Sequence, residues 1–376
     1  SLALLTLFRM RLIFLFFILG LTGASIAQTN FEHAIEYRQK LGFLAAHRGV
    51  MAHMPKNPAW AGELSYVLRS RGHKAYHRAY NYPAFGGTLF YGQVGNQEIL
   101  GNYLGVYGYT ELPMISFRNY RMDFKFGLGL GYNNHPYDPI ENPLNVAIAT
   151  RINGLMCLAI KSTYQYKKNA FNIGLDITHF SNAAWKVPNF GINMPFVSVG
   201  YARTIVPVDK MKFDPFEGEA RTPMNITYNQ WYYSVTAILS GKQMMPIGGR
   251  RYPVYALNLS GKHFFGHKAG LELALDLISK QAIIDYQPYI AKSQLDILQV
   301  GAYAAYLVPL DRFHFVFGMG AYLRDKFSPE DPMYHRIGAR YYLKNGLLLN
   351  LTLKTHWARA DYLEYGIGYT FNYRTK

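Results

Sequence analysis

Hydrophobic and polar residues alternate with a period of two along much of this chain. In residues 271–277, 313–317 and 347–353, every second residue is leucine or phenylalanine, and most of the residues between them are polar. Successive side chains of a strand point to opposite faces, so this pattern predicts strands with one apolar and one polar face. The chain is therefore expected to be an all-β protein.

A soluble β-sandwich and a transmembrane barrel both produce such alternation, but three features favour the barrel. The strands are near ten residues long, which suits an oblique crossing of a bilayer. Tyrosines gather at strand ends, as in 231–233 and 340–342. Connections alternate in length, short at 166–170, 264–267, 308–311 and 344–346, and long at 133–153, 279–295 and 324–334. We predict a transmembrane antiparallel β-barrel with an even strand number of roughly 12–16.

The N-terminal residues 1–27 have the features of a secretory signal peptide. Arg9 and Arg11 precede an apolar run, and Ser25 and Ala27 form a small-x-small cleavage site. Met10 is a better candidate for the translation start than Ser1, so residues 1–9 are interpreted as lying upstream of the true start. Residues 28–41 are predicted to be a short N-terminal segment, with an amphipathic helix over 31–43 as one interpretation. Residues 42–376 are assigned to the barrel, and no internal repeat is evident in them.

Composition narrows the location and the partners. The formal net charge is +16, which predicts an anionic partner. For an exported chain, an anionic membrane surface is a better partner than nucleic acid. The single cysteine, Cys157, excludes an intramolecular disulfide. We therefore expect a protein of the bacterial outer membrane that binds no nucleic acid.

The glycines of 126–132 resemble a phosphate-binding loop only superficially. Gly127, Gly129 and Gly131 alternate strictly and lack the G-x-G-x-x-G spacing. Glycines that share one crowded face of a strand are the better interpretation.

The segment 172–181 carries the most informative polar residues. His179 and Ser181 continue the outward, apolar row of Ile173 and Ile177, at the end of the strand that leads into a long connection. By the same parity, Asn193 faces outward on the returning strand and is expected to lie beside His179. A hydroxyl nucleophile needs a base within reach, and the base needs a third group to orient it. Spacing alone also fits a histidine and a serine that merely mark the membrane interface.

The stretch 179–193 resembles the active-site segment of the PagL-type lipid A 3-O-deacylases, also called acyloxyacyl hydrolases. That family carries H-x-S-N followed by P-N-x-G on an outer-membrane barrel. The resemblance implies that His179 and Ser181 are catalytic and that Asn189 helps to bind the oxyanion. Asn182 and Gly191 match the motif without an assigned role, and we group them with Asn189 as candidate substrate-binding residues.

Two departures from the family keep alternatives open. The family carries Glu twelve residues after the serine, where this chain has Asn193, and its barrels are smaller. Asparagine at that spacing resembles outer-membrane phospholipase A. We predict a serine esterase that removes an acyl chain from lipid A in the outer leaflet, with Ser181, His179 and Asn193 as the catalytic set. The alternatives are a phospholipase A and, in another class, a non-enzymatic porin or lipid-transport barrel.

No cofactor or metal is expected for the deacylase. A phospholipase-like enzyme would bring a calcium requirement with it. Lipopolysaccharide or phospholipid in the outer leaflet is the expected substrate in either case.

Overall fold

The computed structural model describes residues 31–72, 74–207, 230–289, 291–327, 332–343, 345–357 and 359–371. The predicted signal peptide lies outside these ranges. The described chain is almost entirely β-sheet, with four short helical segments: η1 (Gly49–Met51), α2 (Ala75–Ala79), α3 (Gln97–Leu100) and α4 (Ala282–Tyr286). No helix in the described ranges is long and apolar enough to cross a membrane.

Sixteen antiparallel strands make up the sheet structure of these residues. The strands are β1 (Phe31–Gly42), β2 (Ala59–Ser70), β3 (Ala84–Gln93), β4 (Asn102–Phe117), β5 (Tyr120–Asn133), β6 (Ile152–Tyr166), β7 (Asn169–Ser181), β8 (Ile192–Val206), β9 (Trp231–Gln243), β10 (Arg251–Phe264), β11 (Gly270–Lys280), β12 (Leu298–Leu310), β13 (Phe313–Arg324), β14 (Met333–Tyr342), β15 (Leu347–His356) and β16 (Arg359–Thr370).

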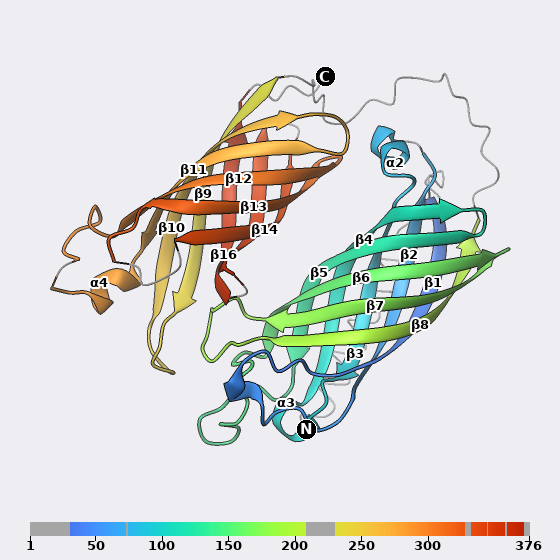
Figure 1. Cartoon of the computed structure of the whole chain (residues 1–376), viewed down its shortest axis with the longest axis horizontal. Helices are drawn as coiled ribbons and strands as arrows, with labels where there is room; N and C mark the ends of the chain where they lie inside the picture. The colour runs from blue at the N-terminus through green and yellow to red at the C-terminus, as the bar shows by residue number, and fades with distance from the viewer. Residues whose placement is uncertain are drawn as a thin grey trace, which may run out of the picture.

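The strands close into two barrels, whereas the sequence analysis assigned them to one. Strand β8 pairs back onto β1, and β16 pairs back onto β9, so each set of eight forms its own closed barrel. Figure 1 shows the first barrel in blue to green and the second in yellow to red. The all-β antiparallel barrel prediction is confirmed. The prediction of a single barrel was wrong. The alternation of apolar and polar residues identifies strands, but it does not show which strand pairs with the first one.

Residues 31–42 form a strand, not a helix, so the first barrel begins at Phe31. The charged side chains of Glu36, Arg38 and Lys40 point into the barrel, where they are fully buried. Ile35 and Tyr37 point outward and are exposed. Residues 43–58, between β1 and β2, form a loop that contains η1.

The second barrel repeats the up-and-down topology of the first, although no sequence repeat is evident. In both barrels one end carries the longer loops and the other carries mostly tight turns. The long connections 134–151, 281–297 and 325–332 agree with the predicted alternation, as do the short ones at 167–168, 311–312 and 343–346. Residues 71–83 depart from this pattern, because they form a long connection with α2 at the short-turn end.

Side chains occupy the interior of each barrel. In the first barrel, Lys40 Nζ lies 2.6 Å from Glu63 Oε1 and 2.9 Å from Asp176 Oδ1, and all three side chains are completely buried. In the second, Arg336 Nε lies 2.6 Å from Glu364 Oε2. An eight-stranded barrel is just wide enough to be filled in this way. The buried cations and carboxylates therefore face each other across the interior of each barrel.

The two barrels lie side by side with the same polarity. At the short-turn end, Lys74 Nζ contacts Asp311 Oδ2 at 2.6 Å. At the loop end, the backbone N–H of Val187 donates to Gln243 Oε1 at 2.8 Å. Between these contacts, the outer walls meet through apolar side chains such as Phe126 and Phe315, whose ring centroids are 4.7 Å apart. The loop ends of the two barrels therefore lie together, as do their short-turn ends. Two barrels that cross the same membrane require this arrangement.

Candidate active site

His179 and Asn193 are direct neighbours on adjacent strands, as their parity predicted. They are paired in the register of β7 and β8. His179 Nδ1 lies 2.6 Å from Asn193 Oδ1. Since an amide oxygen only accepts, Nδ1 carries the proton and Nε2 is left as the basic nitrogen. The amide orientation agrees with this, because Asn193 Nδ2 points to His47 Nδ1 at 3.1 Å.

Ser181 follows His179 on the same outward face of β7, and its hydroxyl contacts Asn189. Asn189 Nδ2 donates to Ser181 Oγ at 3.0 Å. Asn189 Oδ1 accepts the backbone N–H of Asn182, also at 3.0 Å, which turns the amide nitrogen toward the serine. No hydrogen bond joins Ser181 to His179 among the described residues. Two residues apart on one strand, their Cα atoms are about 6.6 Å apart, a spacing at which two side chains on the same face are neighbours.

Asn182 and Gly191 shape the loop 182–191 that carries Asn189. Asn182 is buried, and its Nδ2 donates to the carbonyl of Lys186 at 2.9 Å, so its side chain closes the loop. Gly191 has a φ of +78°, and its N–H donates to the carbonyl of Ala147 at 2.9 Å. The structure therefore gives both residues positions that hold the loop, away from the serine hydroxyl.

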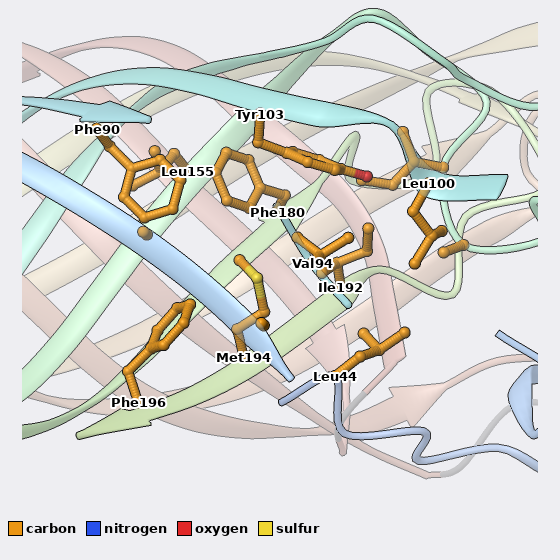
Figure 2. Packing of buried hydrophobic residues seen from close by; sticks show 14 of the residues in the cluster. Leu44, Phe90, Val94, Leu100, Tyr103, Leu155, Phe180, Ile192, Met194 and Phe196 are labelled. Carbon is orange, nitrogen blue, oxygen red and sulfur yellow. The ribbon is translucent and has the colours of Figure 1, made fainter. Parts of the chain in front are cut away.

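Apolar side chains inside the barrel anchor the strands that carry the site. Phe180 lies between His179 and Ser181 in sequence but points inward, is fully buried and packs against Tyr103 with ring centroids 4.8 Å apart. Ile192 and Met194 flank Asn193 in the same way. Figure 2 shows these side chains in one cluster with Phe90 and Leu155. The cluster fixes both strands, and with them the direction of the outward polar side chains.

The glycines of β5 make room for this cluster. They share the inward face of the strand, as the sequence analysis proposed. A Cβ at Gly127 would lie 2.6 Å from the ring of Tyr107, and a Cβ at Gly131 would collide with the ring of Phe180.

The candidate residues open into a groove of about 1880 Å³ between the outer walls of the two barrels. His179, Ser181, Asn189 and Asn193 line its loop end. Outward apolar side chains line its depth, from the first barrel Leu130, Ile152, Met156 and Ile177, and from the second Ile337, Leu351, Leu353, Leu363 and Tyr365. An ester at Ser181 could therefore keep a hydrocarbon chain in apolar surroundings.

The loop 134–151 supplies a carboxylate to the groove. Asp138 accepts hydrogen bonds from the backbone N–H groups of Glu141 and Ile140, which hold the pKa of its carboxyl below the usual range. Asp138 is therefore ionised at neutral pH and is not available as a proton donor.

Two site contacts had no signal in the sequence. His47, which touches Asn193, comes from the loop between β1 and β2 and is 146 residues away. Gln243, which holds the loop at Val187, belongs to the second barrel. Both depend on long-range closure of the fold, which residue spacing does not report.

Two family models match the chain, one on each barrel. Residues 60–202 match lipid A 3-O-deacylase (PagL), and residues 231–373 match the C-terminal domain of acyloxyacyl hydrolase. This chain belongs to the PagL lipid A 3-O-deacylase family. The resemblance seen in the stretch 179–193 is thereby confirmed. Members of this family are ester hydrolases, so the protein is an enzyme of that class, and the non-enzymatic porin alternative is set aside.

Solved structures that match the chain are too distant to bear on its fold or function. Three engineered mutants of Rhodopseudomonas blastica porin match with TM-scores of 0.17. Their sequence identities to this chain are 10%, 8% and 10%. Each match covers 91% of this chain and 100% of the porin. No curated protein matches the chain.

Proposed function

We propose that this protein is a serine esterase of the outer membrane that removes an ester-linked acyl chain from lipid A. Ser181 is the nucleophile, His179 its general base, Asn193 the group that orients the base and Asn189 a donor to the oxyanion. The observation that carries the proposal is the contact of His179 Nδ1 with Asn193 Oδ1 at 2.6 Å, beside the serine of the family motif.

The proton path follows from this contact. With Nδ1 protonated and bound to Asn193, His179 Nε2 takes the proton from Ser181 Oγ as the oxygen attacks the ester carbon. The same imidazolium then protonates the leaving alkoxide, and the acyl group stays on the serine. Water, deprotonated in turn by Nε2, attacks this acyl-enzyme, releases the fatty acid and returns the proton to Ser181.

Negative charge develops on the carbonyl oxygen during each attack. Asn189 Nδ2 is a preorganised donor at this point, because the backbone N–H of Asn182 fixes the opposite end of the amide. A fixed donor stabilises the oxyanion without reorganisation at the moment of reaction.

The surfaces of the barrels support a location in the outer membrane. The outward face of β7 carries Ile173 and Leu175, which are 63% and 64% exposed, while the polar side chains of Asn172, Asp176 and Thr178 on the opposite face are buried. Such an apolar outer wall is stable in contact with hydrocarbon. His179 and Ser181 lie at its loop end, where an ester at the boundary of the acyl region would be presented.

The test is hydrolysis of purified lipid A by the purified protein in detergent, followed by mass spectrometry. Release of one hydroxyacyl chain is expected, and Ser181→Ala should lower kcat by at least about 10³-fold while the circular dichroism spectrum stays unchanged. Gly154 pairs with Ser181 in the register, so the serine backbone contacts persist in that variant. Near-normal turnover of Ser181→Ala would refute the assignment.

A phospholipid is the second candidate substrate, because an asparagine partner of the histidine resembles outer-membrane phospholipase A. Lysophospholipid would then be the product, and EDTA would abolish an activity that calcium restores. Lipid A hydrolysis should instead persist in EDTA, because the proposed proton path uses only groups of the chain.

A further inference from the structure

In the second barrel, the described residues of β15 do not repeat the proposed catalytic pair of β7. The two barrels have the same strand order, so β15 corresponds to β7. Leu351 and Leu353 point outward from β15, and the next outward positions toward the loop end are Thr355 and Trp357. Neither can act as the base that His179 supplies, so β15 does not repeat the His/Ser pair of β7. The histidine at this end, His335, belongs instead to β14, where it pairs with Thr355 in the register.

This same end of β15 nevertheless faces the proposed site. Thr355 and Trp357 line the groove that also contains Ser181 and His179. The corresponding walls of the two barrels therefore face each other, one with the catalytic residues and one with apolar and aromatic side chains. We propose that the second barrel is a non-catalytic wall of the substrate site, and that the groove holds the acyl chain of the lipid ester bound at Ser181. This inference rests on the proposed function and assigns a role to the second half of the chain.

The dimensions of the groove suit a hydrocarbon chain. From Thr355 to Leu351 the strand advances about 13 Å, at about 3.3 Å per residue. A zigzag of C–C bonds advances about 1.25 Å per bond, so this wall alone runs beside roughly ten carbons. Phe126 lines the groove, and its ring packs against Phe315 of the second barrel with centroids 4.7 Å apart. A chain that enters at the ester would therefore meet apolar side chains on both sides until it reaches these rings.

The mouth of the groove carries the charge that an anionic lipid head requires. Arg151 from the first barrel and Arg359 from the second are exposed and line the groove, and so does Lys186 on the site loop. The carboxylates of Asp138 and Glu141 line it as well, so these cations outnumber the anions by only one. Neither arginine forms an ion pair with another described residue. Guanidinium groups bind phosphate with two parallel hydrogen bonds, so the two halves of the chain together present cations to a phosphorylated head group.

The loop 182–191 is fastened to the second barrel, so the wall and the site are held together. Trp185 lies against Gly241, where a Cβ would come within 2.7 Å of the indole, and Arg251 stacks on the same ring at 5.0 Å. Gln243 binds Val187 from the same strand. The backbone N–H of Gln243 also donates to the carbonyl of Ala184 at 3.0 Å. These contacts together set the distance between the serine and the second wall.

The experiment narrows the groove with a bulky substitution on the second barrel and compares the activity on esters with long and short acyl chains. Leu353→Trp narrows the groove, and the matched control Leu349→Trp lies outward on the same strand but does not line it. Each methylene of the acyl chain that the tryptophan keeps out of the groove should lower kcat/KM about fourfold. We expect Leu353→Trp to lose at least about tenfold on long-chain lipid esters and less than about twofold on a butyrate ester. Leu349→Trp should match the unmodified protein on both. Equal effects of the two variants on long-chain esters would overturn the inference.

A second measurement is independent of catalysis. Cys157, the native cysteine, is fully buried, so Leu353→Cys and Leu349→Cys can each be labelled with a maleimide photocrosslinker in the Ser181→Ala background. In vesicles of mixed lipid A and phosphatidylethanolamine, the label at 353 should capture a larger fraction of lipid A than the mole fraction of lipid A in the vesicle. The label at 349 should capture lipids in bulk proportion. If the unmodified protein hydrolyses no ester, the proposed function fails, and the inference is then decided by this crosslink: equal capture at both positions refutes it.

Discussion

Gly191 lies against the imidazole of His179, so closely that a Cβ at 191 would come within 2.9 Å of His179 Cε1. The same Cβ would also meet the carbonyl of Phe180 at 3.4 Å. The returning chain thus passes over the edge of the ring that carries the basic nitrogen. The glycine allows this approach, and its φ of +78° is one that other residues rarely adopt.

Gly191→Ala should therefore displace His179 and lower kcat by about 10²-fold, because small misplacements of a catalytic group have effects of that size. Gly248→Ala is the matched control, since Gly248 has a φ of +83° but open space where its Cβ would lie. That variant should cost about 1 kcal/mol of stability with kcat unchanged. An equal loss of kcat in both variants would show that backbone strain, not contact with the imidazole, matters.

Asn193→Ala should lower kcat by roughly 10²-fold, less than Ser181→Ala, because the base remains but loses the group that fixes its tautomer. Asn193→Glu should retain clearly more activity than Asn193→Ala, since a carboxylate also accepts the Nδ1 proton. Steady-state kinetics of the two variants on one lipid substrate check this order. Wild-type turnover of Asn193→Ala would mean that His179 relies on another partner.

Asn189→Asp separates the oxyanion role from the loop-holding role. The carboxylate can still accept the Asn182 N–H, so the loop should keep its shape, but the donor toward the oxyanion is lost. We expect kcat to fall about 10²–10³-fold with little change in KM. Unchanged kcat would assign the oxyanion to backbone N–H groups alone.

Phe180→Ala should destabilise the first barrel by about 3–5 kcal/mol, because it removes a fully buried ring from the cluster beneath the site. Phe171→Ala on the same strand is the control, since Phe171 points outward and is 56% exposed. Its loss should amount to roughly 1 kcal/mol, from the contact with Tyr201. Urea unfolding in detergent, followed by tryptophan fluorescence, distinguishes the two. Similar midpoints for both variants would contradict the anchoring role.

Local pattern was sufficient to predict the strands and much of the geometry of the site. The period of two placed His179 and Ser181 on the outward face, and parity across the hairpin placed Asn193 beside His179, as the register confirms. The catalytic roles of these residues remain predictions. They follow from the family motif and from chemistry, since position alone also fits a histidine and a serine at a membrane interface.

Closure and long-range partners could not be predicted. An amphipathic helix over 31–43 was one interpretation of the sequence, but Arg38 and Lys40 are buried inside the first barrel. Their partners, Glu63 and Asp176, come from strands β2 and β7 and become neighbours only when the barrel closes. For the same reason, nothing in the alternation shows that β8 returns to β1 and leaves β9 to start a second barrel.

Because both closed barrels belong to one chain, their association is intramolecular. A separate partner would have to be found by lateral diffusion, whereas a tethered one is present at an effective concentration on the order of millimolar. The contacts of Lys74 with Asp311 and of Val187 with Gln243 can therefore be few and individually weak and still keep the walls together. The tether also fixes the stoichiometry at one copy of each barrel, which a symmetric dimer of identical subunits cannot do.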